Sequence, residues 1–72
     1  MTTLAELPVG QTATVKQVEG SDDIAVRLLE MGLTPGVEVK LVGAALLGDP
    51  VELEVRGYRL SLRKSEAKRV WI

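Results

Sequence analysis

The chain has 72 residues, 46% of them hydrophobic, and a formal net charge of −1, which suits one small domain over residues 1–72 with a core of marginal size. It contains no cysteine and no histidine, which excludes disulfides, thiolate nucleophiles and the usual ligands of zinc and copper. Because the sequence shows neither an apolar run of roughly 18 residues nor a signal-peptide pattern, we expect a cytoplasmic protein without a metal, a cofactor or direct membrane insertion.

The first predicted elements are a lead-in and a strand. Leu4 and Leu7 are available to dock on a core, and Pro8 and Gly10 mark a turn. From residue 11 to residue 18, small or β-branched apolar residues alternate with polar ones. This pattern predicts a strand.

A helix over about residues 22–31 is predicted next. Residues 20–23, Gly-Ser-Asp-Asp, offer an N-cap and acidic residues for the first turn. Ile24, Leu28 and Met31 recur at helical spacing and predict one apolar face. Gly32 suits the left-handed position after a helix, and Leu33 would then fold back onto Leu28 in a Schellman ending.

The sequence Thr34-Pro35-Gly36 predicts a type II turn, because proline fixes φ at one central position and glycine permits a positive φ at the next. Strict alternation from Val37 to Leu41 then predicts a strand.

Four apolar residues, 44–47, follow this strand and precede the turn Gly48-Asp49-Pro50. They have two interpretations. The segment could fold inward and close the end of a barrel, or some of these side chains could stay exposed and serve as a contact surface for another protein.

A hairpin is predicted around a two-residue turn at Arg56-Gly57. In this register Val55 lies opposite Tyr58 and Glu54 lies opposite Arg59, so that one face is apolar and turns Tyr58 toward the core. A glycine-containing bulge would shift the pairing by one residue. A helical turn at residues 65–68 and a closing strand at 70–72 complete a mainly β fold, a closed or nearly closed barrel of about five strands.

The sequence offers little for catalysis. No histidine is present to activate a serine. Glu52 and Glu54 share one face of a strand, but alternating glutamates are typical of a solvated face. No phosphate-binding loop is present. We therefore do not expect an enzyme.

The charges are distributed unevenly along the chain. Residues 1–36 carry two basic and five acidic side chains, whereas residues 56–69 carry six basic and one acidic. A basic stretch can bind RNA, but such sites generally add aromatic stacking platforms, and Tyr58 and Trp71 are the only aromatic residues. We do not expect nucleic acid as the partner.

Three segments together resemble the ferrous iron transport protein A family, FeoA. They are ELPVGQTATV near the start, RLLEMGLTPGVEV in the middle and LLGDPVELEVRGYRLSLRKSEAKRV near the end. The resemblance implies an SH3-like barrel with a helical insertion, and an accessory or regulatory role in bacterial ferrous iron uptake beside FeoB, a membrane transporter with a GTPase domain. A similar domain ends some metal-dependent transcriptional repressors.

We accordingly expect a protein-interaction module whose partner is FeoB. Self-association into a homo-oligomer, or binding of RNA or a metal-dependent repressor, is the alternative. We expect a hydrophobic groove as the contact surface, and the expected contact residues are Leu28, Met31, Leu33, Pro35, Leu46, Leu47 and Asp49.

Overall fold

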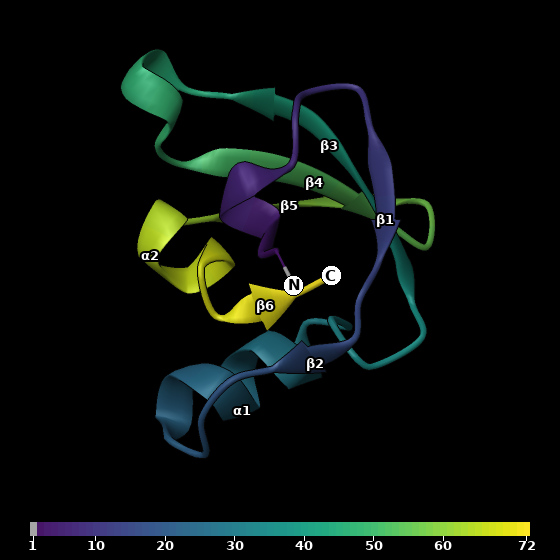
Figure 1. The fold of residues 1–72 in the computed structure, drawn as a ribbon, viewed down its shortest axis with the longest axis vertical. Coiled ribbons are helices and arrows are strands. Elements are labelled where there is room, and N and C mark those ends of the chain that lie inside the picture. Colours follow the sequence, from purple (N-terminus) through teal and green to yellow (C-terminus); the bar gives the residue numbers. More distant parts are fainter. Residues whose placement is uncertain (1) are drawn as a thin grey trace.

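The computed structural model of the protein describes residues 2–72 and shows a mainly β barrel (Figure 1). Within these residues it has six strands, two short α-helices and two 3₁₀ turns, the first of which precedes the first strand. In chain order the elements are η1 (Leu4–Glu6), β1 (Thr12–Thr14), β2 (Gln17–Val18), α1 (Asp23–Glu30), β3 (Glu38–Ala44), η2 (Leu46–Gly48), β4 (Val51–Val55), β5 (Tyr58–Leu62), α2 (Lys64–Ala67) and β6 (Val70–Trp71).

The strands form two antiparallel sheets. The larger has the order β1-β3-β4-β5, and the smaller pairs β2 with β6. The predicted strand over 11–18 is divided between them, because the chain changes partner at residues 15 and 16. The Val15 N–H donates to the Val37 carbonyl, which directly precedes β3 of the larger sheet, and the Lys16 N–H donates to the Trp71 carbonyl of β6. One continuous strand was therefore predicted where the structure has two.

The hairpin register predicted from the sequence is confirmed. Val55 pairs with Tyr58, and Glu54 pairs with Arg59. Arg56 and Gly57 both have positive φ, +49° and +85°, as a two-residue type I′ turn requires. Alternation along β4 buries Val51, Leu53 and Val55 and leaves both glutamates exposed.

The end of α1 and the turn after it also follow the prediction. The Gly32 N–H donates to the Leu29 carbonyl and the Leu33 N–H donates to the Leu28 carbonyl, which is the Schellman pattern. After it, the Val37 N–H donates to the Thr34 carbonyl across the type II turn.

The core lies between the two sheets and is closed on one side by α1, whose Ala25 and Leu28 are buried. Its largest fully buried side chains are Leu4, Leu28, Leu33, Leu53, Leu62, Val15, Val39, Val55 and Val70. The first and last described residues lie side by side, since the Ile72 N–H donates to the Thr2 carbonyl at 2.9 Å. Within residues 2–72, no helix combines the length and the hydropathy needed to cross a bilayer.

Candidate protein-binding surface

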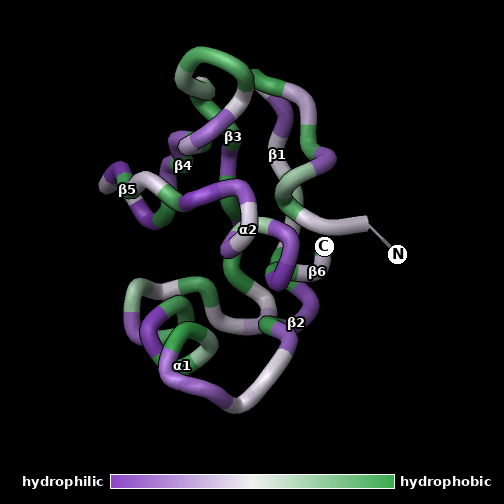
Figure 2. Tube along the Cα trace, turned by 90° about the vertical axis from the view of Figure 1, so that its left-hand side faces the viewer, coloured by the Kyte–Doolittle hydropathy of each residue, from purple (hydrophilic) through white to green (hydrophobic). Residues whose placement is uncertain are grey.

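The most exposed large hydrophobic side chains are Leu46 and Leu47, with 88% and 92% of their surface accessible. They lie in the segment that joins β3 to β4, which we call the leucine loop (residues 45–50). Figure 2 shows a hydrophobic stretch (green) at the top of the molecule, where this segment lies. Ala44 and Ala45 are exposed as well. The interpretation in which this segment closes the barrel is therefore wrong.

Backbone hydrogen bonds hold the leucine loop in shape. The Ala45 N–H donates to the Pro50 carbonyl at 2.9 Å, and the Gly48 N–H donates to the Ala45 carbonyl at 2.8 Å. Leu47 itself has φ +66° and ψ 15°, a left-handed conformation that is costly for a side chain with a Cβ atom. The loop thus keeps a leucine both strained and exposed.

Asp49 fastens the leucine loop to α2. Its Oδ1 accepts a hydrogen bond from the Lys64 N–H at 3.0 Å, at the first residue of that helix. The N–H groups of a first helical turn have no hydrogen-bond acceptor inside the helix. Asp49, from another segment, supplies an acceptor for the Lys64 N–H. The geometry gives this carboxylate a structural task at the base of the loop.

Two of the expected contact residues are buried. Leu28 and Leu33 have 0% of their surface accessible, because the Schellman ending turns Leu33 back into the core that Leu28 already occupies. Their side chains cannot reach a partner in this conformation. Met31 is partly buried and Pro35 is exposed.

The expected groove does not form, because its two halves lie at opposite ends of the molecule. Figures 1 and 2 place η2 at the top and α1 at the bottom, along the longest extent of 29 Å. Strand β3 connects these ends, and its seven residues span about 23 Å. Met31 and Pro35 are therefore separate from Leu46, Leu47 and Asp49.

Helix α1 is fixed to the barrel by ion pairs that the sequence did not reveal. Arg69 donates to both oxygens of Asp22, at 2.7 and 3.1 Å, and Arg27 pairs with Glu66 of α2. Asp22 is also the N-cap of α1, accepting from the Ala25 N–H. The hydrogen bond from Arg69, followed by that from Ala25, lowers the pKa of Asp22. The hydrogen bond between Asp22 and Arg69 also raises the pKa of Arg69.

These pairs join the acidic first half of the chain to its basic last segment. Arg69 was counted above among the basic residues of a candidate RNA-binding stretch. In the structure it forms an ion pair with Asp22. Part of the charge asymmetry in the sequence is thus used within the fold.

The prediction that Tyr58 turns toward the core is wrong. The side chain is 44% exposed, and its hydroxyl donates to the Met31 carbonyl at the end of α1. Gly32 lies beneath it, so close that a Cβ atom at this position would be 2.5 Å from the tyrosine oxygen. Tyr58 therefore fastens the hairpin to the end of α1.

The predicted apolar stripe of α1 is also displaced. Ala25 and Leu28 are buried, whereas Ile24 is exposed. Val26 and Leu29 are exposed too, which gives α1 a scattered apolar surface at the bottom of the molecule.

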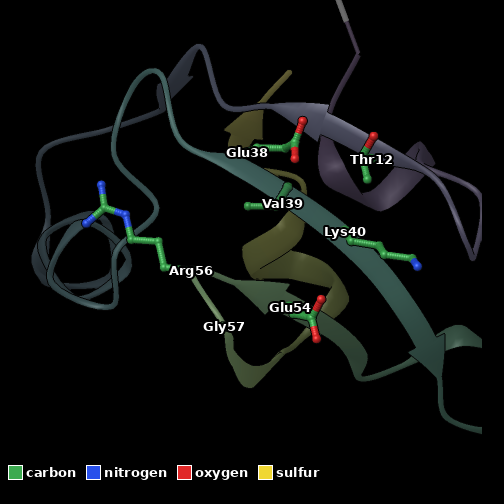
Figure 3. A pocket seen from close by; sticks show the side chains of 7 residues that line it. All are labelled: Thr12, Glu38, Val39, Lys40, Glu54, Arg56 and Gly57. Atoms are coloured by element: carbon green, nitrogen blue, oxygen red, sulfur yellow. The ribbon is translucent and has the colours of Figure 1, made fainter.

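The outer face of the larger sheet carries a shallow hollow of about 240 Å³ (Figure 3). Glu38 and Lys40 come from β3, Glu54 from β4 and Arg56 from the hairpin turn, and Figure 3 shows their charged ends spread apart. Among residues 2–72, no three acidic side chains come close enough to hold a metal ion. The hollow is thus a surface with charges of both signs and, among the described residues, without a cluster of metal ligands.

Comparisons with known proteins agree with this fold. The model of the FeoA domain family matches residues 2–72. A Porphyromonas gingivalis protein, the Fe(2+) transport protein A/Fe(2+) transporter FeoB fusion protein, is 37% identical over 67 residues. The match covers 93% of this chain but 8% of the fusion protein.

Solved structures give the same result. FeoA of Stenotrophomonas maltophilia, solved in complex with zinc and described as a procaryotic SH3 domain protein, is 41% identical, with a TM-score of 0.87 over 99% of this chain and 88% of that one. Iron(II) transport protein A of Clostridium thermocellum is 35% identical, with a TM-score of 0.90 over 96% of this chain and 43% of that one. The fold is therefore the expected SH3-like barrel, and the chain belongs to the FeoA family, which is linked to ferrous iron transport.

Proposed function

We propose that this domain is a cytoplasmic protein-interaction module, not an enzyme, and that it regulates a FeoB-type ferrous iron transporter by docking on it through Leu46 and Leu47. The observation that carries the proposal is the pair of leucines, 88% and 92% exposed, on a hydrogen-bonded loop. Burying a leucine side chain in an interface stabilises a complex by about 1.5–3 kcal/mol, and an ordered loop loses little entropy on binding.

The choice of partner is supported by the fusion protein, in which a sequence similar to this chain is joined to FeoB. Joining two domains raises their effective concentration, which benefits domains that work in contact. For a separate chain, the same contact would depend on the affinity of the docking surface itself. Exposed leucines are a suitable source of that affinity.

The test compares two aspartate variants that place the same charge at opposite ends of the molecule. Leu46→Asp alters the leucine loop, and Val26→Asp alters α1, where Val26 is 49% exposed. Each is titrated against the FeoB protein of the same organism, purified in detergent, by biolayer interferometry. We expect Leu46→Asp to weaken binding by about 30-fold or more, as loss of an interface hot spot of about 2 kcal/mol does. Val26→Asp should bind as the wild type does.

Equal affinities of Leu46→Asp and the wild type would refute the leucine loop as the docking surface. Absence of wild-type binding to FeoB would refute the partner. Sedimentation equilibrium on the free domain addresses the homo-oligomer alternative, because a surface reserved for another protein leaves the wild type monomeric at micromolar concentration.

A further inference from the structure

Strand β5 has an unpaired edge. It is the last strand of the β1-β3-β4-β5 sheet, and within residues 2–72 it pairs with β4 alone. The two-residue turn makes Val55 and Tyr58 a hydrogen-bonded pair. Hydrogen-bonded and non-hydrogen-bonded pairs alternate along an antiparallel ladder. The pairs Leu53–Leu60 and Val51–Leu62 are therefore hydrogen-bonded as well. The N–H and C=O groups of Arg59 and Ser61 therefore point away from β4, toward the position of a further strand.

The side chains along this edge are basic. Residues 56–64 include Arg56, Arg59, Arg63 and Lys64 and no acidic residue. Arg59 has 65% of its side-chain surface accessible, and its ion pair with Glu52 is long, at 3.9 Å. An incoming strand would thus meet cations whose charge is largely available.

The opposite face of β5 is apolar and only partly covered. Leu60 packs against the core but remains partly accessible, and Tyr58 is 44% exposed. A strand added to β5 would lie beside these side chains on one face and beside Arg59 on the other. The matching sequence alternates apolar and acidic residues. Strand β4, which pairs with the other edge of β5, has such an alternating sequence: its Leu53 lies opposite Leu60 and its Glu54 lies opposite Arg59.

We infer that the β5 edge is a second docking site, which binds an extended segment of alternating acidic and apolar residues from another protein by strand addition. Strand addition obtains affinity from backbone hydrogen bonds and specificity from alternate side chains. This site is separate from the leucine loop, and its existence does not depend on the proposed contact with FeoB.

A second copy of this chain is a poorer occupant. If two β5 strands pair antiparallel about Leu60, Arg56 of one meets Lys64 of the other, and if they pair about Arg59, the two arginines face each other. Like charges directly opposite each other destabilise a strand pair, and charged edge residues commonly prevent such pairing. The basic side chains that disfavour pairing with a second β5 strand favour pairing with an acidic strand.

The test uses a capped peptide in which valine and glutamate alternate, flanked by threonines, with a second peptide that has lysine in place of glutamate as its control. Amide exchange of the ¹⁵N-labelled protein is followed by NMR. At a peptide concentration ten times Kd, exchange at Arg59 and Ser61 should slow by about tenfold. Tyr58 and Leu60, whose amides already bond to β4, should change little. The lysine peptide should have no such effect.

Two variants make the test independent of a single folding outcome. Ser61→Pro removes an outward N–H without breaking the β4 ladder, a change that edge strands tolerate, and it should abolish the protection at Arg59. Arg59→Glu should weaken binding of the glutamate peptide by about tenfold and admit the lysine peptide, because a favourable cross-strand charge pair becomes a repulsive one.

Protection of Arg59 and Ser61 by the glutamate peptide, with loss of protection in Ser61→Pro or weaker binding in Arg59→Glu, would support the site. Binding that persists in both variants would overturn it. Concentration-dependent protection without peptide would identify a second copy as the occupant, and protection by an RNA oligomer in place of the peptide would identify a nucleic acid. Either result would overturn the inference.

Discussion

Leu47 has a strained backbone conformation that the rest of the fold does not require a leucine to adopt. Its left-handed conformation, with φ +66°, suits glycine or asparagine far better than leucine. Because the side chain is 92% exposed, packing inside the domain does not compensate for the strain. Strain of this kind persists where the surroundings fix it, often at binding sites.

Replacing Leu47 should therefore separate stability from binding. We expect Leu47→Asn to raise the free energy of unfolding by about 1 kcal/mol, since asparagine tolerates the left-handed region, and to weaken binding to FeoB. Urea denaturation and the interferometry assay measure the two effects. A variant that is less stable than the wild type would show that Leu47 contributes packing within the domain.

Gly32 tests the contact between the hairpin and the end of α1. Its φ is +104°, and a Cβ atom would be 2.5 Å from the Tyr58 hydroxyl oxygen. Gly57 also has a positive φ but has open space around it, so Gly57→Ala is the matched control. We expect Gly57→Ala to cost about 1 kcal/mol and Gly32→Ala to cost more.

The excess cost at Gly32 should depend on Tyr58. In a Tyr58→Phe background the colliding oxygen is absent, so the cost of Gly32→Ala should fall toward that of the control. Chemical denaturation of the four proteins in this double-mutant cycle measures the coupling. Additive effects would contradict the contact.

Among the elements, α1 is held by charged contacts, through Asp22 at its N-cap and through Arg27. Asp22 accepts hydrogen bonds from Arg69 and from the Ala25 N–H, and these lower its pKa in the folded state. A lowered pKa gives stability that is fully present above the unfolded value of about 3.9 and is lost as pH falls through the folded value. Asp22 should therefore contribute at neutral pH and not in strong acid.

We expect Asp22→Asn to be less stable than the wild type at pH 7, and the difference to shrink as pH falls below about 4. Asparagine is a good N-cap, so the comparison removes the charge and keeps the cap. Urea denaturation from pH 7 to pH 2.5 provides the measurement. A difference that stays constant over this range would mean that the Asp22 charge does not stabilise the fold.

The elements that the sequence predicts well are those determined by neighbours in the chain. The hairpin register follows from the alternation in residues 51–55 and the Arg56-Gly57 turn, and the helix end follows from Gly32. The division of strand 11–18 was missed because Val15 and Lys16 bond to partners far along the chain. The exposure of Ile24 likewise depends on how α1 sits against the barrel.

At the scale of the whole molecule, the sequence predicted the barrel but not the arrangement of its surfaces. Apolar residues near the end of α1 and in the leucine loop were assigned to one groove, yet β3 separates them. Leu28 and Leu33 serve the core, whereas Leu46 and Leu47 are exposed. Hydrophobicity alone does not distinguish a core leucine from a surface leucine, because their tertiary neighbours decide their burial.

We propose that FeoB binds the leucine loop, at the end of the molecule opposite α1. Methyl NMR of the leucine- and valine-labelled domain, titrated with FeoB, tests it most directly. We expect the methyl signals of Leu46 and Leu47 to shift or broaden first, while those of Val26 on α1 stay unchanged. Changes at Val26 with Leu46 and Leu47 unaffected would contradict it.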